Sequence, residues 1–167
     1  MSSGKGLREL RAPVIQLHHD SQRHHWLVSM STRGRLELCD SVKASTTSND
    51  LARQLIQTYS NVYAEEGELP FYILPTQAQS GVDCGLHAAA VATQLCNGED
   101  PTVHFSKQLL RPHLLDCLNN ENTVIFPTIP RRRRKATTKK KSISTTEFSS
   151  ENWTLFFLLR PRHTFKY

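Results

Sequence analysis

One stretch, residues 75–87, constrains the fold of this chain more than any other, because it joins a predicted strand to a predicted helix through a glycine-containing turn. The apolar run 71–74 lies between two prolines just before it, which predicts a short strand. The alanine-rich run 86–95 predicts a helix, which Asn97-Gly98 would end. The chain is therefore expected to pass from sheet to helix within this stretch.

Cys84 lies at the start of the predicted helix, with Asp83 as its expected N-cap. The unpaired N–H groups and the positive end of the helix dipole at that position favour a thiolate over a thiol. Two interpretations are open at this point. Cys84 is either a nucleophile or a buried, small apolar residue, as free cysteines commonly are, and the stretch by itself does not separate them.

Three short strands, at 14–17, 25–30 and 35–39, are predicted ahead of this stretch, separated by turn signals at 20–23 and 32–34. The three consecutive strands are expected to form an antiparallel meander. The polar cluster 46–50 then supplies an N-cap for an amphipathic helix, whose apolar face is Leu51, Leu55, Ile56 and Tyr59. A later helical segment is expected to consist of two pieces, the second opened by Pro112.

Length and charge divide the chain into one domain and a basic tail. The 167 residues suffice for a single domain with a substantial core. Residues 1–126 contain 10 Lys/Arg and 13 Asp/Glu, a charge of −3, whereas residues 127–167 contain 11 and 2, a charge of +9. We therefore expect a flexible N-terminus over 1–12, a domain over 13–127 and a basic, disordered tail over 128–167.

The cysteines and the hydropathy pattern predict an intracellular protein. The four cysteines form no CxxC pair and follow no signal peptide, which favours reduced thiols; they are Cys39, Cys84, Cys96 and Cys117. Apart from Cys84, they are expected in the core. No apolar run approaches the roughly 18 residues that a membrane span needs, so no membrane association is expected. The predicted location is nuclear or cytoplasmic.

A cysteine nucleophile needs a base to take its proton and a group to orient that base. His25 lies in the second predicted strand and Asp40 at the end of the third, where neighbouring antiparallel strands can bring their side chains together. Gln79 precedes Cys84 by five residues and could donate its side-chain amide to an oxyanion, together with the backbone N–H of Cys84.

These residues, in this order, resemble the ubiquitin-like-protein-specific cysteine proteases, the family of the SUMO proteases and the adenovirus protease, with relatives in mobile elements. The resemblance covers roughly residues 13–127 and lies in His25-Trp26, Asp40-Ser41, the segment 79–85 (Gln-Ser-Gly-Val-Asp-Cys-Gly) and the alanine-rich helix. It implies an α+β fold with a papain-like core, in which a small mixed or antiparallel sheet packs on a helix that starts at the nucleophile.

The resemblance also implies the chemistry. His25 would be the base, Asp40 its orienting group, Cys84 the nucleophile and Gln79 the oxyanion donor. The implied reaction is hydrolysis of a peptide or isopeptide bond after a C-terminal Gly-Gly of a ubiquitin-like protein, with no cofactor. The implied partners are ubiquitin-like proteins or their conjugates.

Two departures from the family pattern leave alternatives open. The family usually has one more residue between its glutamine and its cysteine, so Gln77 and Gln79 are both candidates for the oxyanion donor. The family's N-terminal helical portion, with a tryptophan that helps to roof the Gly-Gly tunnel, has no counterpart before Val14, so the domain is expected to be shortened. The alternative function is a catalytically weak or inactive copy that acts as a nuclear adaptor for a ubiquitin-like protein.

The remaining histidines and the tail have simpler interpretations. The histidine pairs 18–19 and 24–25 alternate faces on strands and lack the spacing of zinc sites, so no metal site is expected. The basic runs 131–135 and 139–141 are a candidate nuclear localisation signal, a non-specific contact for polyanions, or a solvated tail without function. The apolar run 153–159 has no assigned role.

Overall fold

The computed structural model describes residues 14–32, 35–42, 47–64, 66–79, 81–130 and 138–145. The expected flexible N-terminus 1–12, the basic run 131–135 and the apolar run 153–159 lie outside the described residues. The elements in chain order are β1 (Val14–Asp20), β2 (His25–Thr32), β3 (Arg35–Asp40), α1 (Asn49–Tyr63), β4 (Glu68–Pro75), α2 (Cys84–Cys96), β5 (His104–Phe105), α3 (Lys107–Asn119), β6 (Thr128–Ile129) and β7 (Lys139–Ser144).

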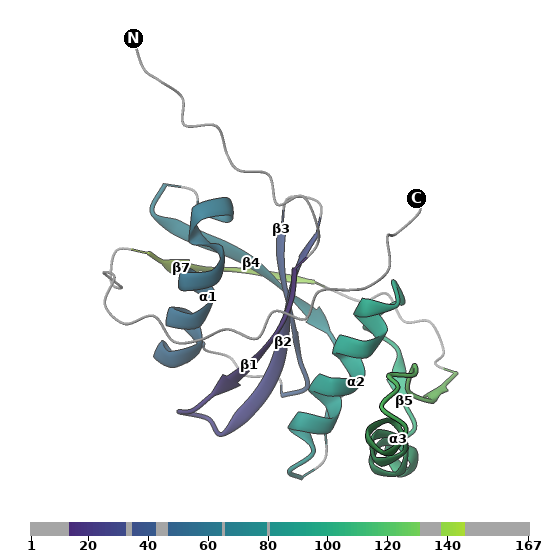
Figure 1. Cartoon of the computed structure of the whole chain (residues 1–167). Coiled ribbons are helices and arrows are strands. Elements are labelled where there is room, and N and C mark those ends of the chain that lie inside the picture. Colours follow the sequence, from purple (N-terminus) through teal and green to yellow (C-terminus); the bar gives the residue numbers. More distant parts are fainter. Residues whose placement is uncertain are drawn as a thin grey trace.

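A five-stranded sheet in the order β1-β2-β3-β4-β7 forms the centre of the domain (Figure 1). Neighbouring strands in this sheet are antiparallel, except β3 and β4, which are parallel. A parallel pair needs a crossover connection, and α1 supplies it between these two strands. The predicted three-stranded meander and the mixed α+β class are confirmed. A second sheet pairs the short strands β5 and β6.

The two faces of the sheet carry separate apolar clusters, and one helix covers each (Figure 1). Successive side chains of a strand point to opposite faces, so Leu27 joins the cluster under α1 and its neighbour Val28 joins the cluster under α2. Full burial of such a side chain contributes roughly 1.5–3 kcal/mol. The alternation along β2 therefore fixes which helix covers which face.

Helix α1 forms where its amphipathic pattern predicts it. Ser48 is the N-cap, and its side-chain oxygen accepts a hydrogen bond from the N–H of Leu51 at 3.1 Å. All four residues of the predicted apolar face are buried. They pack against residues of β2, β3 and β4, so the helix is held by tertiary contact as well as by its cap.

Helix α2 also matches its prediction, from Cys84 to the C-cap Asn97. Gly98 follows with φ 74°, a left-handed conformation that glycine adopts readily at a helix end. The helix is buried on most sides because it lies between the sheet and α3. This burial explains its run of alanines, whose small side chains allow close approach to the strands.

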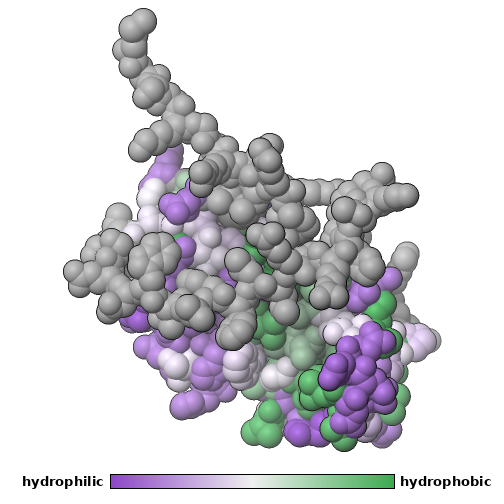
Figure 2. Space-filling view, in the orientation of Figure 1, coloured by the Kyte–Doolittle hydropathy of each residue, from purple (hydrophilic) through white to green (hydrophobic). Residues whose placement is uncertain are grey.

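Helix α3 corrects one prediction, because Lys107–Asn119 is a single helix with Pro112 inside it. Pro112 is exposed, so water can reach the carbonyl group that lacks an N–H donor at this point. Leu110 is the buried residue of this helix. Helix α3 and the segment after it carry exposed apolar side chains; they are Leu109, Leu115, Leu118, Val124 and Ile125. Figure 2 shows green among purple at the lower right, where α3 lies in the same orientation.

Strand β7 corrects a second prediction. The expectation of a disordered tail over 128–167 is wrong for Lys139–Ser144, which pairs with β4 and extends the central sheet beyond the predicted domain end at 127. Ile143 packs against the α1-side cluster, whereas Lys139 and Lys140 are exposed. The lysine-rich sequence has little intrinsic tendency to form a strand, and pairing with the edge of β4 overrides it. Within the described part of the chain, no helix is long and apolar enough to cross a membrane.

Candidate active site

His25 and Asp40 meet at one end of the sheet. His25 begins β2 and Asp40 ends β3, so their antiparallel pairing brings both residues to the same edge. Nε2 of His25 lies 2.6 Å from Oδ1 of Asp40, and His25 is only 4% exposed. Nε2 thus donates its hydrogen to the carboxylate of Asp40, and Nδ1 is the ring nitrogen that can accept a proton from a nucleophile.

The Asp40 carboxylate is held at both oxygens. The N–H of Val42 donates to Oδ1 at 2.8 Å, and Nη2 of Arg23 donates to Oδ2 at 3.2 Å. Sequence reasoning did not single out Arg23. Its only signal was an arginine in the predicted turn just before His25, which is also what an ordinary polar turn contains.

Cys84 and His25 line one open cavity of about 500 Å³. The cavity is lined by residues of the turn before β2, the loop after β3 and the segment that leads into α2. Its other lining residues are Arg23, His24, Trp26, Val42, Gln79, Gly81, Val82 and Gly85. Cys84 is 9% exposed, whereas the neighbouring Val82 is 87% exposed. The thiol is therefore sheltered, but it borders a space that a ligand can enter.

The backbone around Cys84 favours negative charge. Gly81 has φ 64°, a conformation that glycine adopts without strain, and it turns the chain into α2. The first helical hydrogen bond runs from the N–H of His87 to the carbonyl of Asp83 at 3.0 Å. The N–H groups of the preceding residues have no partner within the helix, so they can stabilise a thiolate or an oxyanion. Asp83 is the N-cap by position, but its carboxylate pairs with Arg111 at 2.6 Å and makes no side-chain cap.

The structure separates the two glutamine candidates. Gln79 lines the cavity with Cys84, whereas Gln77 does not. Ser41 Oγ donates to Oε1 of Gln79 at 2.6 Å, and Nε2 of Gln79 donates to the carbonyl of Gly81 at 3.1 Å. An amide nitrogen has two N–H groups, so one more donor is left on Nε2 for a substrate oxygen.

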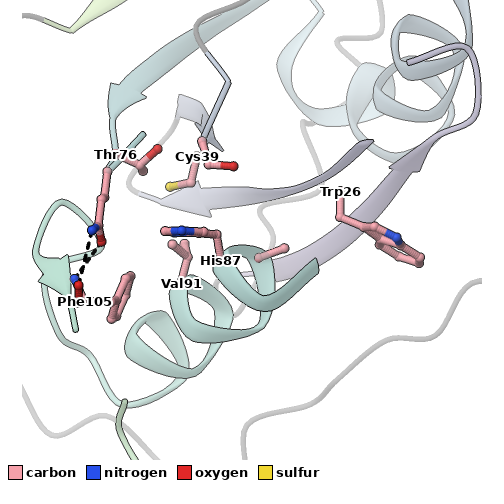
Figure 3. A pocket seen from close by; sticks show the side chains of 9 residues that line it. Trp26, Cys39, Thr76, His87, Val91 and Phe105 are labelled. Atoms are coloured by element: carbon pink, nitrogen blue, oxygen red, sulfur yellow. Dashed lines mark hydrogen bonds between the residues drawn. The ribbon is translucent and has the colours of Figure 1, made fainter. Parts of the chain in front are cut away.

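Gln77 is a structural residue. It is 7% exposed, and its side chain makes two hydrogen bonds with the backbone of Phe105, marked by dashed lines in Figure 3. Nε2 donates to the carbonyl at 3.2 Å, and Oε1 accepts from the N–H at 2.7 Å. These bonds attach the segment after β4 to β5.

A second, small cavity of about 10 Å³ lies beside Gln77 (Figure 3). Cys39 and His87 both line it, which raises the question of a second thiol–imidazole pair. Burial, with a lesser contribution from Lys107, lowers the pKa of His87, and burial, with a lesser contribution from Glu37, raises the pKa of the Cys39 thiol. Both groups are therefore neutral near pH 7, and this pair does not favour a thiolate. Burial also raises the pKa of Cys96.

The remaining histidines of β1 have packing roles. The ring nitrogens of His18 lie 3.1 Å from Oε1 of Gln54 and 2.7 Å from Oγ of Ser29, and the ring of His19 packs at a tilt against Trp26 with ring centres 4.8 Å apart. Among the described residues, no three or more histidine, cysteine or acidic side chains are grouped as a metal site.

No model of a protein family matches this chain, and comparisons with curated proteins and with solved structures likewise gave no match.

Proposed function

We propose that this chain is a cysteine peptidase with a papain-like core, which cleaves peptide or isopeptide bonds after the C-terminal Gly-Gly of a ubiquitin-like protein. The observation that carries the proposal is the shared cavity: Cys84 at the start of α2 borders the same space as His25, and the ring of His25 is hydrogen-bonded to Asp40. Nucleophile, base and orienting group come from three separate segments, an arrangement typical of nucleophilic catalysis.

In the proposed reaction, Nδ1 of His25 takes the thiol proton of Cys84, and the thiolate forms a bond to the scissile carbonyl carbon. The tetrahedral intermediate then collapses, the carbon–nitrogen bond breaks, and the leaving amine takes the proton from His25. Water, deprotonated by the same imidazole, hydrolyses the thioester and releases the carboxylate product. Asp40 holds the ring in the orientation needed for both proton transfers and stabilises its charged form.

Gln79 and the backbone N–H of Cys84 are the proposed oxyanion donors. The carboxamide oxygen of Gln79 is held by Ser41, so its amide group is oriented before the substrate arrives. A donor oriented in advance stabilises the developing charge without reorganising in the transition state. Ser41 directly follows Asp40, so one loop supports both the base and the oxyanion donor.

The choice of a ubiquitin-like protein as substrate rests on the resemblance of the motifs around His25, Asp40 and Cys84. The decisive experiment is incubation of the full chain with a panel of ubiquitin-like proteins that carry a C-terminal electrophile. We expect a covalent adduct with at least one of them. The adduct should be lost in Cys84→Ser and retained in the matched variants Cys39→Ser, Cys96→Ser and Cys117→Ser.

Labelling that survives Cys84→Ser would overturn the assignment of the nucleophile. Non-covalent binding by a folded parent chain that forms no adduct would instead support the adaptor function.

A fluorescent fusion would show whether the chain is nuclear or cytoplasmic, and salt-sensitive binding to a polyanion would test the proposed role of the basic residues after 127.

A further inference from the structure

The turn between β1 and β2 holds an arginine between two carboxylates. Asp20 ends β1 and is the register partner of His25, which begins β2. The N–H of Arg23 donates to the carbonyl oxygen and to Oδ1 of Asp20, at 3.3 Å in both cases. Nη1 of Arg23 lies 3.5 Å from Oδ2 of Asp20, and Nη2 lies 3.2 Å from Oδ2 of Asp40. One side chain therefore connects a carboxylate of β1 with the carboxylate that contacts His25.

The same turn is anchored to α1. The N–H and O–H groups of Ser21 donate to Oδ2 of Asp50 at 2.7 and 2.6 Å, and these bonds lower the pKa of Asp50. The N–H of Asn49 donates to Oε1 of Gln22 at 3.1 Å. The backbone that carries Arg23 is thus fixed by an element outside the cavity.

Burial makes the ion pair between Arg23 and Asp20 necessary. Asp20 is fully buried, and its Oδ2 makes no hydrogen bond within the described part of the chain. A buried carboxylate is costly unless a cation compensates it, and Nη1 of Arg23 is within ion-pair distance. The side chain of Arg23 is only 22% exposed, so water and salt screen these contacts less than they would at the surface.

We propose that Arg23 is a positioning residue of the candidate active site: anchored by Asp20, it fixes the Asp40 carboxylate so that His25 presents Nδ1 to Cys84. The inference rests on the proposed function for the identity of the catalytic pair. His25 and Val42 hold Oδ1 of Asp40, and Arg23 holds Oδ2, so the carboxylate cannot rotate freely.

Arg23 also sets the charge of the site. With a neutral imidazole, the two carboxylates and the guanidinium sum to −1, and protonation of His25 brings the sum to zero. The guanidinium therefore offsets one of the two carboxylates that would otherwise disfavour a thiolate on Cys84. A lysine keeps the charge but has a single ammonium group in place of the planar fork, so it cannot bridge both carboxylates in this way.

Other charged and titratable groups lie near His25 and Cys84, but most of them contact other residues. Asp83 before α2 is paired with Arg111 of α3, and His19 of β1 packs against Trp26. His24 in the turn lines the cavity, and His87 of α2 faces the small cavity instead. Only Arg23, among the described residues, forms an ion pair with both Asp20 and Asp40.

The test measures alkylation of Cys84 by iodoacetamide against pH, resolved by peptide mass spectrometry, in the full chain. In Arg23→Gln we expect the rising limb of the rate profile to move to higher pH by about 0.5–1 unit, because loss of a nearby cation disfavours the thiolate. The rate at pH 7 should fall several-fold. Arg23→Lys should keep the limb near its parental position, since the charge is retained, but its rate at pH 7 should still fall, because a lysine cannot bridge both carboxylates and His25 loses its fixed orientation. Arg53→Gln removes the same charge from the exposed face of α1 and should leave the profile unchanged.

An unmoved limb in folded Arg23→Gln overturns the proposal. Failure of both Arg23 variants to fold also overturns it, because the role of the arginine would then be structural. Alkylation needs no protein substrate, so its outcome is separate from that of the proposed function. If no ubiquitin-like probe labels the chain, the proposed substrate is refuted. A shift of the alkylation profile in Arg23→Gln would still support the role of Arg23 in that case.

Discussion

Replacing Gln77 with alanine should destabilise the fold, because this side chain joins the segment after β4 to β5. The change removes the partners of the N–H and the carbonyl of Phe105, a residue that is 1% exposed. A buried polar group without a partner costs about 1–3 kcal/mol, so the two groups together would cost about 2–6 kcal/mol. The adjacent cavity of about 10 Å³ would grow enough to admit a water molecule, which recovers part of this energy.

We therefore expect Gln77→Ala to lower the free energy of unfolding by about 2–4 kcal/mol. For a chain of this length, that loss corresponds to a decrease in Tm of roughly 4–16 °C. Urea unfolding followed by circular dichroism, with a thermal melt of the same samples, measures both quantities. Catalytic turnover per folded molecule should stay within about tenfold of the parent, since Gln77 does not line the cavity of Cys84.

The matched control is Gln79→Ala, which should show the opposite pattern. Gln79 is half-buried, and water can replace its side-chain bonds to Ser41 and Gly81, so we expect a loss of stability below about 1 kcal/mol. Turnover on a fluorogenic Gly-Gly substrate should fall on the order of 10²–10³ if Gln79 is the oxyanion donor. A Gln77→Ala protein as stable as the parent, or a Gln79→Ala protein that is the less stable of the two, would refute this reasoning.

Two further predictions concern stability. Burial, partly offset by the hydrogen bond to Gln54, lowers the pKa of His18 from 6.5 to about 4. The neutral, buried His18 therefore contributes to the free energy of unfolding above about pH 6.5, and this contribution is lost as the pH falls towards 4. The loss is roughly 3 kcal/mol. Urea titrations across this range should show the decline, and His18→Gln should remove most of it, leaving the smaller part due to His87; an equally steep decline in His18→Gln would contradict the assignment. Ile143→Ser should lower the free energy of unfolding by about 1–2 kcal/mol, because Ile143 packs on the α1-side cluster, whereas the exposed Ser142→Ala should change it little; equal effects would argue against the docking of β7.

Much of the local structure could be predicted from the sequence, because short-range physics determines it. Helix α2 follows from a run of alanines ended by Asn97-Gly98, and α1 follows from an N-cap and an apolar face at helical spacing. Both signals act over a few residues, so no knowledge of distant contacts is needed. The same holds for the position of Cys84 at the start of a helix, which the sequence predicts before any partner is known.

Tertiary structure decided the features that depend on partners far away in the chain. Lys139–Ser144 is a strand only because β4 offers it an edge and the α1-side cluster accepts Ile143. Gln77 and Gln79 have the same chemistry and are two residues apart, a spacing that places both on one side of an extended segment, so periodicity cannot separate them. The contact of Gln77 with Phe105 separates them, and the sequence gives no signal for it.

The candidate site divides in the same way. The sequence by itself determined the residue types and their order, His25, Asp40 and Cys84, together with the helix that begins at Cys84. Only the folded chain brings Asp40 of β3 within ion-pair distance of Arg23, which also pairs with the fully buried Asp20. Local propensity carries no information about such charge balance, which exists only once burial has removed water from the carboxylates.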